Sequence, residues 1–385
     1  MAPMTLTLLS VLLHGYVGWR LLPGWDGHPA VQLALAVLLL LSALLVPHGL
    51  RHKPLRPPRL EEAVSWAALL FMGLFSSLFV LTALRDVLLL AGALGRWLMP
   101  TVITPDALAA LSQASALAVP VLSLTASLWG LVNARRTAGI VSVDVPLPGL
   151  PPALQGFTIA QITDIHVGPT IKAPYLRAIV RAVNALDADV VAVTGDLVDG
   201  SVRQLASHVA PLAELRSRHG TYFVTGNHEY YSGAHAWVAE LRRLGVHVLM
   251  NQHVVLARGD AALVLAGVND YSAHHFDPTH RSDPQAALAG APASIATRVL
   301  LAHQPRTAAA AAEAGFQLQI SGHTHGGQFL PWRWFVRFQQ PFTAGLHRWQ
   351  GLWVYTSRGT GYWGPPKRLG APSEITRLRL VGAPG

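Results

Sequence analysis

Acidic, amide and imidazole side chains follow five short apolar runs in the later part of this 385-residue chain. Each run has the length and composition of a buried strand and ends in a polar motif. The expected strands are 157–163, 190–194, 222–225, 298–302 and 318–320, and the motifs after them contain Asp164, Asp196, Asn227, His303 and His323. Because ligands bind beyond the carboxyl ends of strands in open α/β sheets, we expect these motifs to converge on one site.

The donors in these motifs suit divalent metal ions. Asp164 and His166 can face one site where the chain curls after a strand. Asp196 follows Gly195, which permits close backbone approach, and its carboxylate can bridge two cations. A set of Asp, Asn and His without Cys suits Mn²⁺, Fe or Zn²⁺. A single strand-end His is more often structural than a ligand, but five such motifs in succession favour a metal site.

Composition excludes several other classes of protein. The chain has no Cys, which rules out a disulfide scaffold, Cys-ligated zinc or iron–sulfur sites and a Cys nucleophile. Charged residues make up 13% of the chain and hydrophobic residues 51%, whereas a soluble domain averages about 25% charged residues. We therefore expect part of the chain to lie in lipid.

Residues 1–139 form the expected membrane domain. Four apolar stretches, 4–22, 30–47, 63–84 (extending to 95 in one reading) and 107–132, are each near the ~20 residues that cross ~30 Å of hydrocarbon as a helix. A buried hairpin is the alternative for the first two, because the second is short and the first contains His14 and ends at Arg20.

Loop cations predict the orientation of this domain. One side of four spans receives Arg51, Lys53, Arg56, Arg59, Arg135 and Arg136. The other side receives Arg20, Arg85 and Arg96, so the positive-inside rule places the chain start and everything after residue 135 in the cytoplasm of a multi-pass inner-membrane protein. A fifth helix over 86–104 would move the C-terminal domain to the opposite face.

The sequence pattern of residues 140–385 is typical of an α/β domain. Short β-rich runs alternate there with helical stretches such as 174–185 and 235–244. The prolines at 146, 148, 151 and 152 predict a stiff linker between the last membrane helix and this domain.

The five motifs, Asp-x-His, Gly-Asp-x-x-Asp, Gly-Asn-His-Glu, His and Gly-His-x-His, resemble in content and order those of the calcineurin-like metallophosphoesterases. The resemblance covers about residues 140–385 and implies a four-layer αββα sandwich. Residues 323–331 and 357–375 are similar, more narrowly, to the bacterial branch of transmembrane proteins with a metallophosphoesterase domain. That branch includes membrane-attached UDP-diacylglucosamine pyrophosphohydrolases of lipid A synthesis and cell-envelope phosphodiesterases.

The resemblance also implies roles for individual residues. One metal would be held by Asp164, His166 and His325, a second by Asn227, His303 and His323, and Asp196 would bridge both. Two such ions activate water for attack on phosphorus and neutralise developing charge. His228 would donate a proton to the leaving oxygen or stabilise its charge, and Asp199 would orient His228 and raise its pKa.

Other residues near these motifs have less specific interpretations. We expect Glu229 to be a structural hydrogen-bonding residue behind its loop. Arg358 either binds a substrate phosphate through its fork of N–H groups or pins its own loop. The three histidines at 274, 275 and 280 are interpreted as part of a solvated loop.

An aromatic and cationic segment follows the last metal motif and bears on the substrate. Within 329–338, Trp332, Trp334, Phe335 and Phe338 alternate with Arg333 and Arg337. Such a segment suits a bilayer interface or covers acyl chains, and a core-facing element with two snorkelling arginines is the alternative. Nucleic acid is not an expected partner, because the chain has no dense Lys/Arg run.

These observations predict a membrane-anchored hydrolase with two divalent metal ions. We expect it to cleave a phosphodiester or pyrophosphate bond, with an amphiphilic phosphorylated substrate such as UDP-2,3-diacylglucosamine of lipid A biosynthesis. The alternative is a general cell-envelope phosphodiesterase or phosphatase whose catalytic domain faces the periplasm. A membrane scaffold that has lost turnover is disfavoured, because no expected ligand position is substituted.

Overall fold

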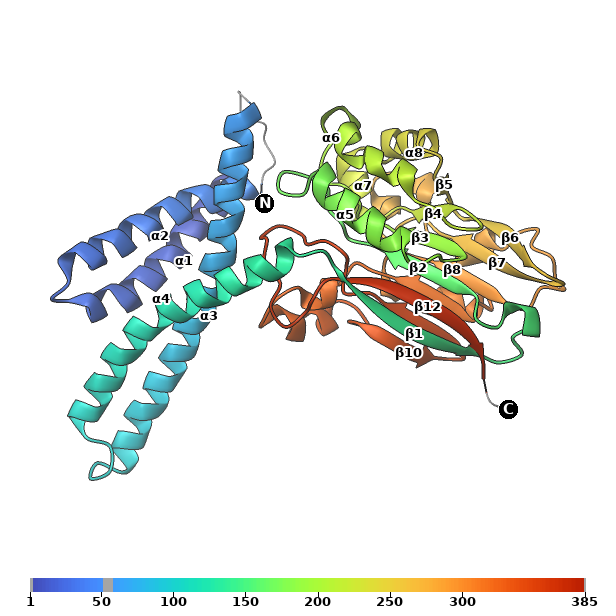
Figure 1. The fold of residues 1–385 in the computed structure, drawn as a ribbon. Coiled ribbons are helices and arrows are strands. Elements are labelled where there is room, and N and C mark those ends of the chain that lie inside the picture. Colours follow the sequence, from blue (N-terminus) through green and yellow to red (C-terminus); the bar gives the residue numbers. More distant parts are fainter. Residues whose placement is uncertain (1–2, 51–57, 384–385) are drawn as a thin grey trace. The chain divides into compact units, whose positions relative to one another are not determined.

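The computed structural model describes residues 3–50 and 58–383, and it divides into two units (Figure 1). The first comprises Met1–Val132 with Gly364–Lys367, and the second comprises Asn133–Trp363 with Arg368–Gly385. The predicted domain boundary at 139/140 lies a few residues further along the chain than this division.

Four long apolar helices build the first unit, α1 (Pro3–Leu21), α2 (Pro29–Gly49), α3 (Pro58–Leu98) and α4 (Pro105–Arg135). Each begins at a proline, whose fixed φ and missing N–H are compatible with the first helical turn. All four are long and apolar enough to cross a membrane, which confirms the four predicted stretches.

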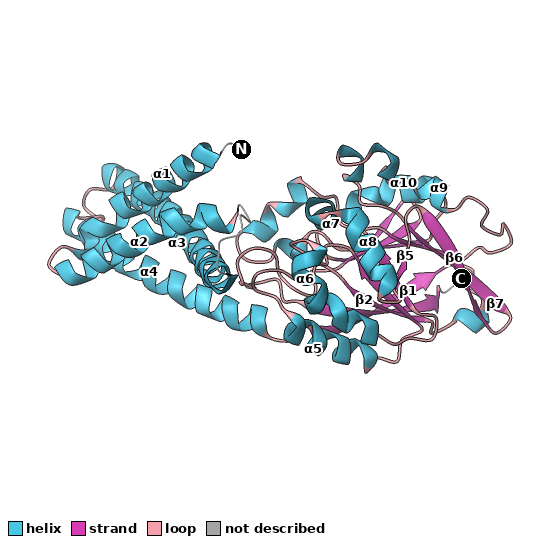
Figure 2. Cartoon of the chain, turned by 90° about the horizontal axis from the view of Figure 1, so that it is seen from above, coloured by secondary structure: helices cyan, strands magenta, loops and turns pink. Residues whose placement is uncertain are grey.

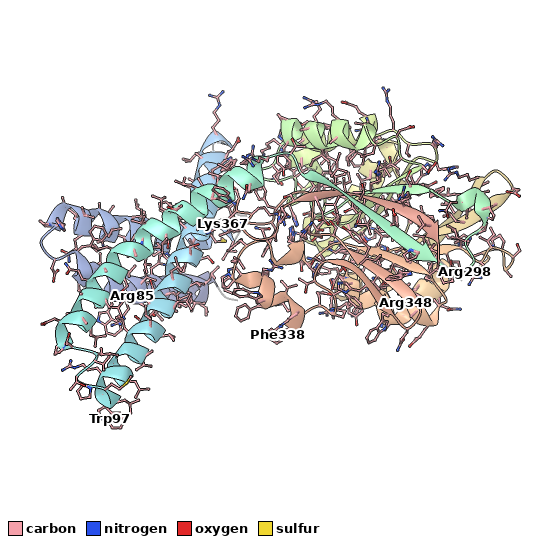
Figure 3. All side chains as sticks on the ribbon, turned by 60° about the horizontal axis from the view of Figure 1, so that its bottom comes forward. Arg85, Trp97, Arg298, Phe338, Arg348 and Lys367 are labelled. Atoms are coloured by element: carbon pink, nitrogen blue, oxygen red, sulfur yellow. The ribbon has the colours of Figure 1, made fainter. Side chains whose placement is uncertain are left out.

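Helix α3 agrees with the longer of its two predicted extents, which reached residue 95. It runs without a break to Leu98, so residues 86–98 continue the third helix and do not begin a separate fifth one. Arg85 therefore lies inside α3 and not in a loop as predicted (Figure 3). Its guanidinium donates to Ser115 Oγ and Ser112 O of α4 at 3.0 and 2.9 Å. Pairing within the bundle is the usual way for a helix of this kind to carry a charge.

Arg20 was also predicted to lie in a loop, and this prediction is wrong. This residue lies in the last turn of α1, where its side chain donates to the carboxylate of Asp86 on α3 at 2.9 Å. Three of the other loop cations, Arg51, Lys53 and Arg56, lie outside the described residues.

The second unit contains two six-stranded mixed sheets. The first has the order β1-β12-β2-β3-β4-β5 and the second the order β10-β11-β9-β8-β7-β6. The strands are β1 (Gly139–Leu147), β2 (Thr158–Ile162), β3 (Val190–Thr194), β4 (Thr221–Val224), β5 (His247–Val248), β6 (Gln252–Arg258), β7 (Ala261–Gly267), β8 (Arg298–Leu301), β9 (Leu318–Ser321), β10 (Gly345–Trp349), β11 (Leu352–Thr356) and β12 (Glu374–Gly382).

Alternating side chains of these strands build three apolar layers. In β3, Val190 and Ala192 face the second sheet, whereas Val191 and Val193 face a helical layer. The helices are α5 (Ala173–Asn184), α6 (Val202–Val209), α7 (Asn227–Ser232), α8 (Ala234–Arg243), α9 (Pro284–Ala287) and α10 (Ala308–Glu313). Residues of α5, α6 and α8 cover the first sheet and those of α9 and α10 cover the second, with helices flanking the strands in Figure 2. This arrangement is the expected four-layer αββα sandwich.

The predicted proline linker is wrong in part. Pro146 lies within β1, which pairs in parallel with β12 over Gly139–Leu147. Val145 and Leu147 of this strand are buried in the layer between the sheets. Proline is compatible with this position because β1 is an edge strand, where one row of N–H groups has no ladder partner.

Candidate metal centre

Parallel strands from both sheets place the candidate ligands at one edge of the sandwich. In the first sheet, β2, β3 and β4 are adjacent and parallel, and in the second, β8 and β9 are adjacent and parallel. The residues that follow these strand ends are Asp164 and His166 after β2, Asp196 after β3, Asn227 after β4, His303 after β8, and His323 and His325 after β9. The predicted strands are thus confirmed to within two residues.

One group of donors gathers around His325. Its Nε2 lies 3.1 Å from His166 Nε2 and 3.5 Å from Asp164 Oδ1. These three residues are buried, with ligand atoms close enough to hold a single ion. The separations fit donors that share one cation at ~2.0–2.2 Å from each.

A second group gathers around Asp196. Its Oδ2 lies 3.1 Å from His303 Nε2, and His323 Nδ1 lies 3.2 Å from the same His303 nitrogen. The same Oδ2 is 3.9 Å from His166 Nε2 of the first group. Asp196 Oδ1 accepts the backbone N–H of His228 at 2.9 Å, which fixes the carboxylate with Oδ2 directed toward both groups.

Asn227 provides a separate test of whether these residues fit a metal. Its side chain is 8% exposed, and among the described residues no hydrogen-bond donor reaches its buried Oδ1. A buried amide oxygen without a partner costs about 1–3 kcal/mol, so it is uncommon in a folded protein. A bound cation would satisfy this oxygen, and the donor set therefore fits bound metal.

Backbone strain coincides with the candidate ligands. Positive φ angles occur at Asp164 (53°), His166 (56°), Asp196 (50°), His323 (72°) and His325 (51°). Such angles are uncommon for residues other than glycine and persist where the surrounding structure holds them. Five of the seven candidate ligands therefore adopt a conformation that costs stability and aims their side chains inward.

Two glycines allow the loops to approach one another. At Gly195, where φ is 85°, a Cβ would lie 2.6 Å from Gly226 N, so the close approach expected before Asp196 is present. At Gly322, a Cβ would lie 2.2 Å from Asp164 Oδ2. A larger residue at either position would displace a candidate ligand.

Burial holds two of the candidate imidazoles, His323 and His325, in the neutral form, whereas in His303 the charge of Asp196 outweighs burial and raises the pKa. His303 Nδ1 lies 2.8 Å from Thr194 O, and a carbonyl can only accept, so this nitrogen donates and Nε2 faces Asp196. Burial, reinforced by the charge of His303, lowers the pKa of His323 to about 3. Burial also holds the pKa of His325 well below its usual range. Neutral imidazole is the form that binds metal ions.

Asp199 holds two imidazoles at once. Its Oδ1 accepts from His228 Nδ1 at 2.6 Å and from His166 Nδ1 at 3.0 Å. Sequence analysis paired Asp199 only with His228. The contact to His166 adds a second task, because an outer partner at Nδ1 orients Nε2 toward a metal.

His228 combines partial exposure with a raised pKa. Burial lowers its pKa, but the charge of Asp196 and the hydrogen bond to Asp199 outweigh burial and raise it to about 9. The side chain is 15% exposed, and its ring is flanked by Tyr231 and Trp363. The bond to Asp199 leaves Nε2 of His228 facing the candidate ligands, 3.9 Å from Asp196 Oδ2.

Glu229 has the structural role expected of it. Its carboxylate accepts backbone N–H groups of Gly226 at 2.6 Å, Leu197 at 2.8 Å and Asp196 at 3.0 Å. These contacts join the loops after β3 and β4 behind the ligands. Burial, together with the charge of Asp196, raises the pKa of Glu229 to about 8.

Two roles were predicted for Arg358, binding a substrate phosphate or holding its own loop in place. The structure shows the contact that holds the loop. Its Nε and Nη2 each lie 2.6 Å from Glu374 Oε2, and its backbone N–H donates to Glu374 Oε1. The side chain is 33% exposed, so binding of a substrate phosphate remains a prediction.

Sequence analysis missed Arg368, which is 1% exposed. Its guanidinium donates to the carbonyls of His325 at 3.0 Å, Arg358 at 2.7 Å and Ala371 at 3.2 Å. These bonds hold the His325 loop against the C-terminal loop. Its position in a Pro-rich tail, far along the chain from any ligand, carried no signal in the sequence.

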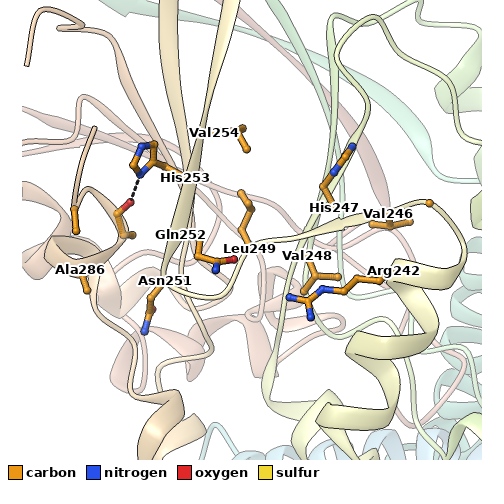
Figure 4. Close-up of a pocket in the computed structure, with 13 residues that line it drawn as sticks. Arg242, Val246, His247, Val248, Leu249, Asn251, Gln252, His253, Val254 and Ala286 are labelled. Carbon is orange, nitrogen blue, oxygen red and sulfur yellow. Dashed lines mark hydrogen bonds between the residues drawn. The ribbon is translucent and has the colours of Figure 1, made fainter. Parts of the chain in front are cut away.

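A surface pocket of about 750 Å³ lies elsewhere in the same unit (Figure 4). Its lining includes Arg242, His247, Asn251 and His253, from the end of α8, from β5 and β6 and from the turn between those two strands. The described residues around it include none of the seven candidate ligands. The candidate chemistry therefore does not depend on this pocket.

Comparisons with known proteins agree with this geometry. The family model described as calcineurin-like phosphoesterase matches residues 157–327. A Bos taurus protein named transmembrane protein with metallophosphoesterase domain is 43% identical over 280 residues, which cover 70% of this chain and 63% of the relative. A Danio rerio protein of the same name is 36% identical over 329 residues, covering 83% and 74% of the two chains.

A bacterial relative gives a similar result. An uncharacterized metallophosphoesterase of Campylobacter jejuni is 35% identical over 268 residues, covering 69% of each chain. The match to the Danio rerio protein covers more of this chain than residues 140–385 contain, so it extends into the apolar helices. The similarity therefore includes the membrane part as well as the ligand motifs.

Proposed function

Because the chain belongs to the calcineurin-like metallophosphoesterases, we propose that this membrane-associated, metal-dependent hydrolase cleaves a phosphodiester or pyrophosphate bond in a lipid-linked substrate. The observation that carries the proposal is the position of Asp196 Oδ2. It lies 3.1 Å from His303 Nε2 and 3.9 Å from His166 Nε2, between the two donor groups. A carboxylate in this position is suited to bridge two cations.

We propose that the ligands divide between two cations as the resemblance implies. Asp164, His166 and His325 would hold one cation, Asn227, His303 and His323 the other, and Asp196 would contact both. When bound, two divalent cations supply a nucleophilic hydroxide at neutral pH and neutralise charge on the phosphoryl oxygens. The oxygen and imidazole donors accept Mn²⁺, Fe or Zn²⁺.

His228 would serve the leaving group. Asp199 accepts the Nδ1 proton and fixes the ring, so the protonated Nε2 can donate to the oxygen that leaves phosphorus. Its partial exposure gives a substrate access from the solvent side. Tyr231 and Trp363 limit rotation of the ring.

The aromatic segment supports an amphiphilic substrate. It begins after the His325 turn and includes η8 (Trp332–Trp334) and η9 (Val336–Phe338). The exposed fractions are 41% for Trp332, 59% for Trp334, 53% for Phe335 and 75% for Phe338, which is labelled in Figure 3. The core-facing alternative is therefore wrong, since these rings face outward. Exposed Trp and Phe beside arginines are typical of surfaces that enter a bilayer interface.

Removing the two tryptophans together, Trp332→Ala with Trp334→Ala, is expected to raise KM for a lipid substrate by about tenfold or more. An apolar side chain buried against acyl chains contributes about 1.5–3 kcal/mol, and tenfold corresponds to about 1.4 kcal/mol. Kinetics on mixed micelles and on bis-p-nitrophenyl phosphate separate lipid binding from chemistry. Trp349→Ala, a comparably exposed tryptophan on β10, is the matched control. Equal loss on the soluble diester would contradict a lipid-binding role.

The substrate itself is tested by product analysis. Full-length protein in detergent is given UDP-2,3-diacylglucosamine, a lipid phosphodiester without a nucleotide, and bis-p-nitrophenyl phosphate. Release of UMP would assign the protein to lipid A synthesis. Cleavage of the other diesters alone would support the second candidate, a general envelope phosphodiesterase.

The side of the membrane on which the catalytic domain lies distinguishes the enzyme of lipid A synthesis from the general envelope phosphodiesterase. We propose a bacterial inner membrane with the catalytic domain in the cytoplasm, because an even number of spans leaves both ends of the four-helix unit on one face and the sequence places more Lys and Arg on that face. A reporter fused after residue 383 that is active only in the cytoplasm supports this orientation. A periplasmic signal would require the envelope phosphodiesterase, since a cytoplasmic nucleotide-lipid does not reach that face.

A further inference from the structure

A second cluster of metal-type donors shares no residue with the candidate metal centre. His235 lies in the first turn of α8, and Asp277 and His280 lie at the 3₁₀ turn η5 (Pro278–His280). Asp277 Oδ2 is 3.1 Å from His235 Nε2 and 3.8 Å from His280 Nε2, and all three donor atoms lie within 4.8 Å of one another. The interpretation of His280 as part of a solvated loop is therefore wrong, because its side chain is only 12% exposed and faces this cluster.

Hydrogen bonds from outside the cluster fix two of its donors. Asp277 Oδ1 accepts from the backbone N–H of Thr279 at 2.9 Å and from its hydroxyl at 2.6 Å, so Oδ2 is left to face the histidines. His280 Nδ1 lies 3.0 Å from Tyr230 Oη, so its Nε2 faces Asp277. Partners of this kind orient metal ligands and set their tautomers.

The spacing of the three donors fits tetrahedral zinc. Ligand atoms at ~2.0–2.1 Å from a tetrahedral Zn²⁺ are about 3.3 Å apart, a value between the two separations from Asp277 Oδ2. The His235 side chain is 76% exposed and can rotate to complete the site, and its exposure leaves the fourth position to water. Burial lowers the pKa of His280, which favours the neutral form that a metal requires.

We propose that His235, Asp277 and His280 form a zinc site that joins the start of α8 to the loop after β7. Two imidazoles and one carboxylate suit Zn²⁺ better than Mn²⁺ by the general order of affinities. Helix α7, which carries His228, also contacts Phe276 of the same loop. The ring centroid of Phe276 lies 5.8 Å from that of Tyr230 and 5.4 Å from that of Tyr231. Zinc here would hold this loop against the helix that carries Asn227 and His228.

Zinc stoichiometry tests the proposal independently of the reaction. Full-length protein in detergent is equilibrated with Zn²⁺ at defined free concentration, and metal per chain is measured for wild type, His235→Ala and His275→Ala. His235 is exposed, so its removal should leave the fold intact, and an unchanged circular-dichroism spectrum and elution volume check this. His275, an exposed histidine of the same loop outside the cluster, is the matched control.

The expected result is one zinc fewer per chain in His235→Ala than in wild type, with His275→Ala unchanged. Equal zinc in wild type and His235→Ala would overturn the proposal and leave the cluster as a hydrogen-bonded ion pair. Equal loss in both variants would also overturn it, because the binding would not be specific to the cluster. Anomalous diffraction at the zinc edge gives a second readout, with a peak expected between His235, Asp277 and His280.

Discussion

Replacing Asp196 by Asn should lower kcat/KM for a phosphodiester about 10³-fold or more. Asp196 Oδ2 serves both donor groups, so the change weakens two metal positions at once. Metal stabilisation of transition-state charge contributes several kcal/mol, and each ~1.4 kcal/mol is tenfold in rate. Asn preserves side-chain shape and can still accept the His228 N–H, so the variant should remain folded.

The matched control for Asp196→Asn is Asp187→Asn, which changes a carboxylate whose side chain is 86% exposed. Steady-state kinetics on bis-p-nitrophenyl phosphate and metal content per chain are measured for both variants. Retention of wild-type kcat/KM in Asp196→Asn would contradict the bridging role. Lower activity with unchanged metal content would place the effect of Asp196 elsewhere in the chemistry.

His228→Ala should slow cleavage by about 10²–10⁴-fold for poor leaving groups, the range typical of a positioned general acid. The loss should be much smaller for p-nitrophenolate, which leaves without protonation. A plot of log kcat/KM against leaving-group pKa should therefore be steeper for the variant than for wild type. His347→Ala, which removes an exposed histidine on β10, should match wild type.

A uniform loss across all leaving groups would show that His228 does not protonate the leaving oxygen. In that case its contact with Asp199 would matter only for holding His166, since one carboxylate oxygen serves both rings. Measuring the metal bound per chain in His228→Ala identifies this outcome. If the variant disturbs the bond from Asp199 to His166, metal affinity should fall, typically 10–100-fold.

The part of the fold that the sequence predicted best is the set of buried strands. β3 and β4 are continuous apolar runs bounded by glycine motifs, and burial on both faces explains why their composition is distinctive. β1 was missed because Pro146 favours a linker, and only its edge position makes the proline compatible with pairing. Local sequence does not reveal which strand will lie at an edge.

The shorter of the two readings of the third membrane helix, 63–84, was wrong for a different reason. The adjacent Arg85 and Asp86 interrupt the apolar pattern and suggest a loop. In the structure Arg85 bonds to serines of α4 and Asp86 to Arg20 and Tyr16 of α1. Partners from other helices make the charges compatible with a continuous helix, and sequence spacing does not reveal them.

The candidate metal centre could be predicted because each ligand follows a strand in a recognisable motif. The structure brings six of the seven candidate ligands together with His228 and Asp199, and Asn227 lies one residue before His228, with no hydrogen-bond partner for its amide oxygen among the described residues. The proposed zinc site could not be predicted, since His235 and His280 lie on separate elements, and His280 and Asp277 depend on Tyr230 and Thr279 for their orientation. Arg368 was missed for the same reason, because its role exists only where two loops meet.

The central claim is that these seven ligands hold the metal ions that hydrolyse a phosphoester bond. Its most direct test strips full-length protein with a chelator, titrates Mn²⁺ back, and follows bound metal and hydrolysis of bis-p-nitrophenyl phosphate in one sample, beside Asn227→Ala. We predict that activity disappears on stripping and returns in wild type as two Mn²⁺ per chain are bound, with little recovery in the variant. Full activity in the stripped protein, or equal recovery in Asn227→Ala, would contradict the claim.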